Sequence, residues 1–154
     1  MSAYPLSDGL RIRRSSLAFS VKLNIYIDGA SRGNPGPAST GVVLQDTDGN
    51  TVKEFGRTLG VETNNVAEYS ALIDALRLSK EAGATALKVH SDSQLLVRQV
   101  NGQYKIKNPR LGEFIRNIRA MVLEFESFEI VHVRREFNKR ADALANEALD
   151  REFS

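Results

Sequence analysis

Four acidic side chains stand where a carboxylate can be held rigidly and still reach solvent. Asp28 and Asp92 each end a short apolar stretch that alternates like a β-strand, and Glu68 and Asp142 each lie in the first turn of a predicted helix. Ligands of open α/β sheets commonly bind outside the carboxyl ends of the strands. If the two strands are parallel neighbours, their acids emerge at the same end of a sheet.

Each acid alone has an ordinary structural explanation. Asp28 precedes residues 29–37, a segment crowded with turn formers, and aspartate commonly caps turns. An acid at a helix N-terminus, such as Glu68 or Asp142, gains about 0.3–1 kcal/mol from the helix dipole. Four acids in comparable settings are less easily explained in this way, so we expect a shared functional site.

The residue types narrow the chemistry of this site. The chain has no cysteine, and neither of its two histidines has a ligand spacing beside the acids. Oxygen ligands alone select hard cations such as Mg²⁺ or Mn²⁺, and acids brought together raise one another's pKa unless a cation neutralises them. Two such ions, about 3.5–4 Å apart, can activate a water and stabilise a leaving oxygen. The hypothesis is metal-dependent phosphodiester hydrolysis.

The composition is that of a globular domain. The 154 residues are 42% hydrophobic and 26% charged, and the chain is long enough to bury a full core. No apolar run is long enough to span a bilayer, so no membrane partner is expected. The absence of cysteine fits a reducing compartment, and a cytoplasmic location is predicted.

The net charge of +2 comes from the N-terminal segment. Of the 21 basic and 19 acidic side chains, residues 1–20 contain three and one, so residues 21–154 carry 18 of each. Bulk charge therefore does not argue for a polyanionic partner. Residues 1–20 are interpreted as an irregular extension or leader, with a mitochondrial-type presequence as the alternative. Residues 21–154 are expected to form the single domain.

The hydrophobic pattern predicts three strands followed by alternating strands and helices, which implies an α/β (α+β) domain with helices packed on a mixed sheet. Asp48-Gly49 predicts a hairpin, residues 63–65 predict a helix start, and Gly83 is expected to close that helix. Asn138 is expected to cap the final helix. The expected strands are residues 21–28, 38–45, 51–59, 86–92 and 128–133, and the expected helices are 64–81, 93–100, 111–122 and the segment after 138.

Four motifs, in order and spacing, resemble those of type 1 ribonuclease H. The resemblance covers residues 21–150 and implies a monomer with a five-stranded mixed sheet, three antiparallel strands and then two parallel ones. It implies hydrolysis of the RNA strand of RNA–DNA hybrids, with Asp28, Glu68, Asp92 and Asp142 holding two Mg²⁺ ions and Mn²⁺ as a possible substitute. The motifs are Tyr26-Ile-Asp-Gly-Ala-Ser-Arg-Gly-Asn-Pro-Gly-Pro37, Thr63-Asn-Asn-Val-Ala-Glu-Tyr69, His90-Ser-Asp-Ser-Gln-Leu95 and Asn138-Lys-Arg-Ala-Asp-Ala-Leu-Ala145.

The resemblance also assigns residues that contact the hybrid. Asparagine and glutamine both donate and accept hydrogen bonds, so they can contact 2′-hydroxyls and base edges without sequence preference. Loop and cap chemistry is their alternative role, above all before a helix. The assigned residues are Gly29, Ala30, Ser31, Asn34, Asn64, Asn65, Ser93 and Gln94.

The chain departs from many relatives in the region where they carry a basic helical handle. Residues 101–111 are short and offer only Lys105, Lys107 and Arg110, and the chain contains no tryptophan. With the formally neutral domain, this predicts a handle-less form with weaker and more salt-sensitive hybrid binding.

A second departure concerns the catalytic histidine that many relatives carry before the last helix. Residues 133–138 contain no histidine. We expect Arg135 to replace it, because handle-less relatives resemble this Arg-Glu pattern seven residues before Asp142. Arginine can steady phosphate or product charge but cannot shuttle protons. His90 and His132 are expected to be ordinary strand residues.

Two other functions are possible on the same fold. One is a hybrid-binding module that has lost catalysis, and the presence of all four acids argues against it. The other is a transposase or integrase core, and the chain lacks the extra DNA-binding domains that such proteins usually carry. The pair Asn64-Asn65 also suits RNA contact better.

Overall fold

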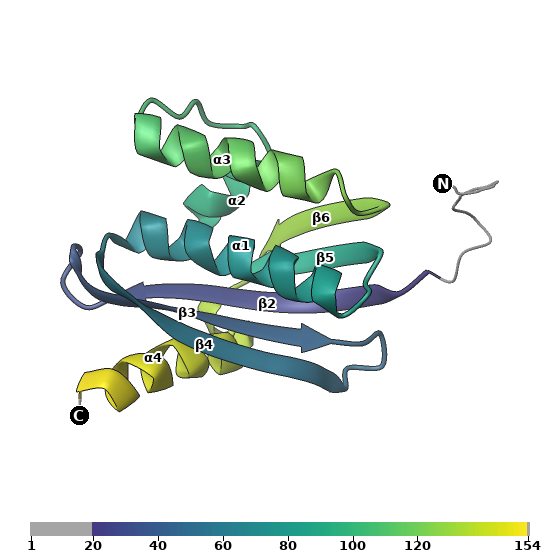
Figure 1. Ribbon diagram of the computed structural model, residues 1–154, viewed down its shortest axis with the longest axis horizontal. Helices are drawn as coiled ribbons and strands as arrows, with labels where there is room; N and C mark the ends of the chain where they lie inside the picture. The colour runs from purple at the N-terminus through teal and green to yellow at the C-terminus, as the bar shows by residue number, and fades with distance from the viewer. Residues whose placement is uncertain (1–19, 154) are drawn as a thin grey trace.

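Five strands and four α-helices follow one another along residues 20–153, the part of the chain that the computed structural model describes (Figure 1). The predicted extension, residues 1–20, lies outside the described residues except for Ser20. Within residues 20–153 no helix is long and apolar enough to cross a membrane. The elements are β2 (Lys22–Ser31), β3 (Gly36–Gln45), β4 (Thr51–Glu62), α1 (Asn64–Glu81), β5 (Ala86–Ser91), α2 (Gln94–Val100), α3 (Pro109–Val122), β6 (Ser127–His132), the 3₁₀ helix η1 (Arg135–Phe137) and α4 (Lys139–Phe153).

The five strands form one mixed sheet in the order β4-β3-β2-β5-β6. β2, β3 and β4 make an antiparallel meander, while β5 pairs in parallel with β2 and β6 in parallel with β5. The predicted arrangement of three antiparallel and two parallel strands is confirmed. The alternation read from the sequence is also confirmed, since Leu23, Ile25 and Ile27 of β2 all point into the main core.

β2 is longer than predicted, because it continues past the expected end at Asp28. The ladder with β3 runs on to Ser31, whereas the ladder with β5 stops at Ile27. The first residues of the expected loop are therefore strand, since β3 still supplies their hydrogen-bond partners. β4 likewise runs to Glu62 instead of Leu59. Asp28 thus lies where β2 loses its neighbour on one side but keeps the other.

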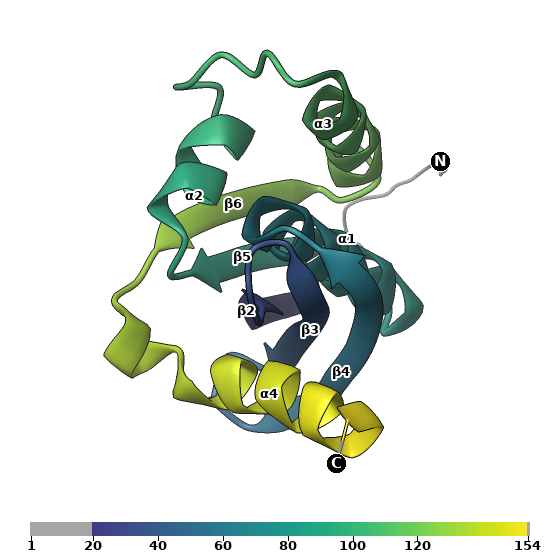
Figure 2. The ribbon, with the colours of Figure 1, turned by 90° about the vertical axis from the view of Figure 1, so that its left-hand side faces the viewer.

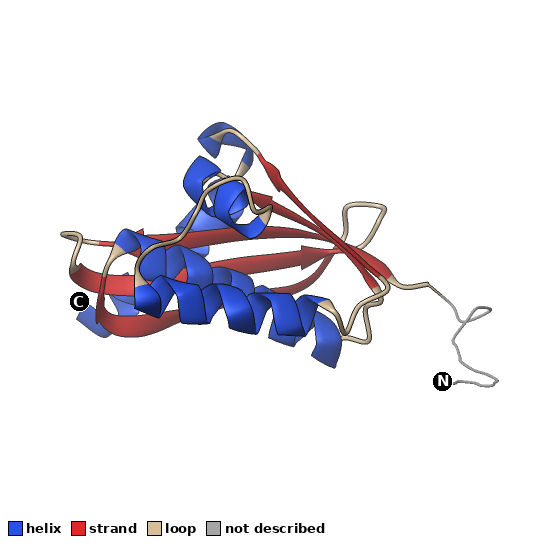
Figure 3. Cartoon of the chain, turned by 90° about the horizontal axis from the view of Figure 1, so that it is seen from above, coloured by secondary structure: helices blue, strands red, loops and turns tan. Residues whose placement is uncertain are grey.

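Helices cover both faces of the sheet. α1, α2 and α3 lie on one face and α4 lies on the other (Figures 1 and 2). α1 runs in roughly the direction of the strands (Figures 1 and 3). Residues such as Val42, Leu72 and Leu76 form the main core under α1, and a smaller cluster around Val43 and Leu144 lies under α4.

The start and end of α1 follow the residues that predicted them, whereas α3 begins at Pro109, two residues before the predicted start, because Asn108 caps it. Thr63 caps α1, because its Oγ1 accepts the N–H of Val66 at 3.2 Å. Ser93 caps α2 in the same way, accepting from the N–H of Leu96 at 3.1 Å. Gly83 follows the end of α1 with a φ of 79°, a backbone conformation that favours glycine. The starts of both helices are thereby fixed close to two of the acids.

Two glycines allow helices to approach the sheet closely. A Cβ on Gly29 would stand 2.3 Å from backbone atoms of Ala67 and Glu68 in α1. A Cβ on Gly41 would stand 2.1 Å from the carbonyl oxygen of Ala141 in α4. Because neither residue has a side chain, α1 and α4 contact the sheet from opposite faces at the end where the acids lie.

Candidate active site

Three carboxylates meet at one end of the sheet. Oxygen atoms of Asp28, Glu68 and Asp92 all lie within 4.8 Å of one another, although these residues come from β2, α1 and the segment after β5. β2 and β5 are parallel neighbours, so Asp28 and Asp92 emerge at the same sheet end, as the sequence predicts. Asp28 is the most buried of the three, with 6% of its surface exposed.

Glu68 reaches the site from the second turn of α1, and the prediction of the first turn is wrong. α1 begins at Asn64 and has no acid in its first turn. The Oε1 atom of Glu68 instead accepts the N–H of Gly29 at 2.8 Å. The contact with the backbone of β2, and not the helix dipole, therefore explains why an acid occupies position 68.

The sequence predicts that Asn138 caps α4. In the structure its side chain contacts Asp92 and does not cap the helix. Its Nδ2 donates to the carbonyl oxygen of Ile27 at 2.8 Å and to Oδ2 of Asp92 at 3.3 Å. Its Oδ1 is buried and has no hydrogen-bond partner among residues 20–153. Only the backbone carbonyl of Asn138 serves the helix, accepting the N–H of Asp142 at 3.2 Å. The side chain is turned towards the sheet, where the buried Ile27 carbonyl needs a donor.

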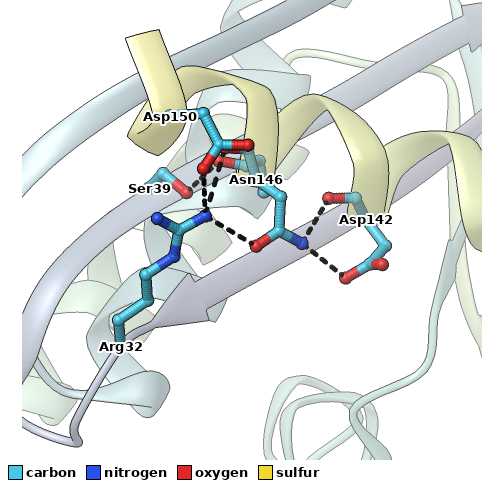
Figure 4. A network of polar contacts seen from close by, with 6 residues as sticks. Arg32, Ser39, Asp142, Asn146 and Asp150 are labelled. Carbon is cyan, nitrogen blue, oxygen red and sulfur yellow. Dashed lines mark hydrogen bonds and ion pairs between the residues drawn. The ribbon is translucent and has the colours of Figure 1, made fainter. Parts of the chain in front are cut away.

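Asp142 lies in the first turn of α4, as predicted. It is close enough to Asp28 for a side-chain hydrogen bond, but it lies outside the group of three. The Nδ2 atom of Asn146 donates to Oδ1 of Asp142 at 3.3 Å and to its carbonyl oxygen at 3.1 Å (Figure 4). No motif in the sequence points to Asn146, although its spacing of four residues from Asp142 places both on one helix face.

Burial and mutual repulsion favour the protonated forms of two of these acids. Burial, followed by the charges of Glu68 and Asp92 and then by contact with Asp142, raises the pKa of Asp28 to about 9. Burial, followed by the charge of Asp92, raises the pKa of Glu68 to about 8, although a backbone N–H acts in the opposite direction. A divalent cation between these oxygens would take the place of the protons. The donor set therefore fits a metal ion.

Arg135 stands at the rim of the same site. It begins η1, a short helix that the sequence pattern did not predict, and its charge slightly offsets the rise in the pKa of Glu68. Both histidines lie in strands, as predicted. His132 ends β6, and the ring of His90 stacks on Tyr26 with its Nδ1 atom 3.0 Å from a backbone carbonyl oxygen.

A cleft of about 400 Å³ lies over the acids. It does not include two of the predicted substrate residues. Asn34 lies outside the cleft, and its Oδ1 atom accepts the N–H of Asn64 at 2.9 Å. Gln94 is exposed at the start of α2. Arg32 and Asn146, which the sequence did not predict, also line the cleft. The predicted residues that the structure brings together there are Asp28, Gly29, Ala30, Ser31, Asn64, Asn65, Glu68, Asp92, Ser93, Arg135 and Asp142.

Comparison with known proteins relates most of the chain to one family. The family described as reverse transcriptase-like matches residues 26–148. Ribonuclease HI of Halobacterium salinarum is 46% identical over 129 residues, which cover 84% of this chain and 65% of that relative. The chain thus spans less than two thirds of the length of that curated relative.

Solved structures show the same relationship. The crystal structure of RNase H1 from Halobacterium salinarum has a TM-score of 0.83 and covers 84% of this chain and 98% of that chain. LC11-RNase H1, solved in complex with an RNA/DNA hybrid, is 45% identical, with a TM-score of 0.82 and coverage of 86% and 99%. Residues 101–108, between α2 and α3, contain no helix, in line with the predicted handle-less form. The chain belongs to the ribonuclease HI family.

Proposed function

We propose that this protein is a metal-dependent ribonuclease H that cuts the RNA strand of RNA–DNA hybrids and leaves 5′-phosphate ends. The observation that carries the proposal is the meeting of Asp28, Glu68 and Asp92 within 4.8 Å in an open cleft. Family membership supports the same activity, since LC11-RNase H1 forms a complex with such a hybrid.

The four carboxylates are the proposed ligands of two divalent ions, Mg²⁺ with Mn²⁺ as a substitute. Oxygen-only donors favour these hard cations. Asp28 is proposed as the shared ligand, because Glu68, Asp92 and Asp142 all act on its pKa. When bound, the ions supply an activated water and charge stabilisation at the leaving oxygen. Burial of Asp28 at the sheet end keeps its carboxylate in place before metal or substrate arrives.

The other residues of the cleft are proposed to bind and orient the hybrid. Residues 29–31 offer backbone groups beside Asp28, and the amides of Asn64 and Asn65 can contact 2′-hydroxyls without reading sequence. Arg135 is proposed to stabilise phosphate charge, because a guanidinium holds its proton throughout. The residues proposed to extend this contact surface are Asn34, Ser93 and Gln94.

Residues 21–154 are proposed to act as one domain and as a monomer, without a membrane partner. A cytoplasmic location is part of the proposal, supported by the cysteine-free composition. Residues 1–20 are proposed to be an irregular N-terminal extension or leader.

The test is a substrate panel of RNA–DNA hybrid, duplex RNA and duplex DNA, each labelled on one strand. Each is incubated with Mg²⁺, with Mn²⁺ and with a chelator, and the Asp28→Asn protein serves as the control for contaminating nuclease. Metal-dependent cutting of only the RNA strand of the hybrid is the expected result. Binding of the hybrid without cutting would favour the inactive binding module, and cutting of DNA would favour a transposase-like core.

A further inference from the structure

The carboxylate of Asp142 is held by a chain of contacts that starts in the turn between β2 and β3. The Nη2 atom of Arg32 donates to Oδ1 of Asn146 at 3.3 Å and to its carbonyl oxygen at 3.4 Å. The Nδ2 atom of Asn146 then donates to Oδ1 of Asp142 at 3.3 Å. Figure 4 shows the three side chains in this sequence. All three residues line the cleft over the acids.

Arg32 and Asp142 together fix which way the amide of Asn146 faces. A guanidinium can only donate hydrogen bonds, so it pairs with the amide oxygen. The NH₂ group of Asn146 is then left facing Asp142, which can accept. Without Arg32, the amide oxygen would lose its partner, and only the contacts of Nδ2 with the carboxylate and the carbonyl oxygen of Asp142 would hold the orientation.

Both ends of these contacts are anchored. Arg32 forms an ion pair with Asp150, one turn further along α4, at 2.7 Å. The buried hydroxyl of Ser39 donates to the carbonyl oxygen of Ala145 at 2.6 Å, which fixes α4 on β3 next to Asn146. The turn and the helix are thereby held in a fixed relation at the level of the site.

The other acids are held differently. Glu68 accepts a backbone N–H from β2, and Asp92 accepts from the buried Asn138. Asp142 lies outside the group of three and relies on Asn146, a residue that is only partly buried. Its position therefore depends on Arg32, whose side chain is 43% exposed at the rim of the cleft.

We propose that Asn146 is a positioning residue for Asp142 and that Arg32 supports the orientation of its amide, so that the β2–β3 turn helps to position the fourth proposed metal ligand. The inference rests on the proposed function, in which Asp142 binds metal. Groups that orient metal ligands are typically worth about 10–100-fold in metal affinity or activity.

The decisive variant is Asn146→Asp. It keeps the size of the side chain and its contact with Arg32, but it removes the donor to Asp142. We expect kcat to fall about 10–100-fold while the Kd for the hybrid stays within about 2-fold. Calorimetric titration with Mg²⁺ in the absence of hybrid should show correspondingly weaker binding. The variant also adds a carboxylate beside Asp142. A role confined to joining the turn to α4 would therefore predict Mg²⁺ binding that is unchanged or stronger, because the contact with Arg32 is retained.

Arg32→Lys is the second variant, with an expected loss smaller than that of Asn146→Asp. In Arg32 the Nη2 atom alone contacts both Asn146 and Asp150. Lysine can still pair with Asp150, but its shorter side chain has to bring the ammonium group to all of these acceptors, so the contact with Asn146 should weaken. The matched control is Glu54→Gln. It breaks the 2.7 Å ion pair with Arg140, which joins β4 to α4 outside the cleft, and it should leave kcat and Mg²⁺ binding unchanged.

Wild-type kcat and Mg²⁺ binding in Asn146→Asp would overturn the inference. An equal loss in Glu54→Gln would also overturn it, because general docking of α4 would then explain the effect. If the wild-type protein does not cut hybrids, the proposed function fails, while the Mg²⁺ titration still tests the contacts around Asp142.

Discussion

Asp28 and Asp74 are both buried aspartates at the interface between α1 and the sheet, and their surroundings are opposite. Asp74 is 1% exposed, and Arg57 donates to both of its oxygens at 2.9 and 3.0 Å, with the Thr40 hydroxyl at 2.9 Å. Asp28 is 6% exposed and is surrounded by further acids. After burial, the charge of Glu68 has the largest effect on its pKa. The chain neutralises one buried charge itself and leaves the other to be neutralised from outside.

The difference separates a structural carboxylate from one that we propose to be functional. A buried charge is costly unless it is paired and hydrogen-bonded. For Asp74 that pairing joins α1 to β3 and β4, so its loss should be felt in folding. For Asp28 the pairing is absent among residues 20–153, so its loss should be felt in metal binding and catalysis.

The largest expected effect is that of Asp28→Asn on activity. The substitution keeps the volume and removes the charge of the proposed shared ligand, so hybrid cleavage should fall at least about 1,000-fold, or about 4 kcal/mol in the barrier. Single-turnover cleavage measures the rate, and a gel-shift titration should show that hybrid binding persists. Near-normal turnover would remove Asp28 from the centre of the site.

Asp74→Asn should have the opposite profile. The free energy of unfolding should fall by about 2–4 kcal/mol, below the full value for a buried pair, because Arg57 is 44% exposed and can be rehydrated. Urea unfolding measures the loss, and kcat of the folded protein should be retained. An unchanged unfolding midpoint, or an activity loss as large as that of Asp28→Asn, would contradict the comparison.

The stability of the metal-free protein should depend on pH in a direction set by Asp28 and Glu68. Their folded-state pKa values, about 9 and about 8, are raised above the ordinary values of 3.8 and 4.5. The folded state therefore binds more protons, and this contribution to stability is present below about pH 4 and is lost as pH rises towards about 9. Thermal unfolding in chelator should show a falling Tm between pH 5 and pH 9, to be compared with the same series in Mg²⁺ and in Asp28→Asn.

Added Mg²⁺ should remove most of that decline, because the ion stabilises the ionised carboxylates of the folded state. In Asp28→Asn the decline should be shallower, since one of the two titrating groups is gone. A Tm in chelator that rises over this range would show that the acids are not held protonated.

The smallest expected effect is that of Arg135→Ala. Loss of the cation at the rim should lower kcat about 10-fold, or about 1.4 kcal/mol, with little change in the free energy of unfolding. His132→Ala is the matched control in the preceding strand, and its kcat should stay close to wild type. Full activity in Arg135→Ala with loss in His132→Ala would reverse the assignment.

The sequence predicted the elements of this fold better than their ends. Alternation of Leu23, Ile25 and Ile27 identifies β2, because one face of the strand must be buried. The end of the strand depends on its neighbours, since β3 continues to pair where β5 has stopped. A pattern within one segment contains no information about where its partner strands end.

The same limit applies to the site. The sequence predicted four acids that the structure brings to one cleft, but the residues that hold them are set by tertiary contacts. From the sequence alone Asn138 is predicted to be a helix cap, because its contacts with β2 and Asp92 appear only in the folded structure. Arg32 and Asn146 are 114 residues apart, and no local pattern connects a turn residue with the last helix.

Gly29 shows that the geometry of the acids also depends on an absent group. A methyl there would stand 2.3 Å from the backbone of α1, so any side chain would push the helix, and Glu68 with it, away from Asp28. The position is therefore expected to tolerate no substitution, whatever part its backbone plays towards a substrate. Transplanting the four acids onto another mixed sheet would reproduce the ligands without their spacing, unless the recipient strand also carried a hydrogen atom where every other residue has a carbon.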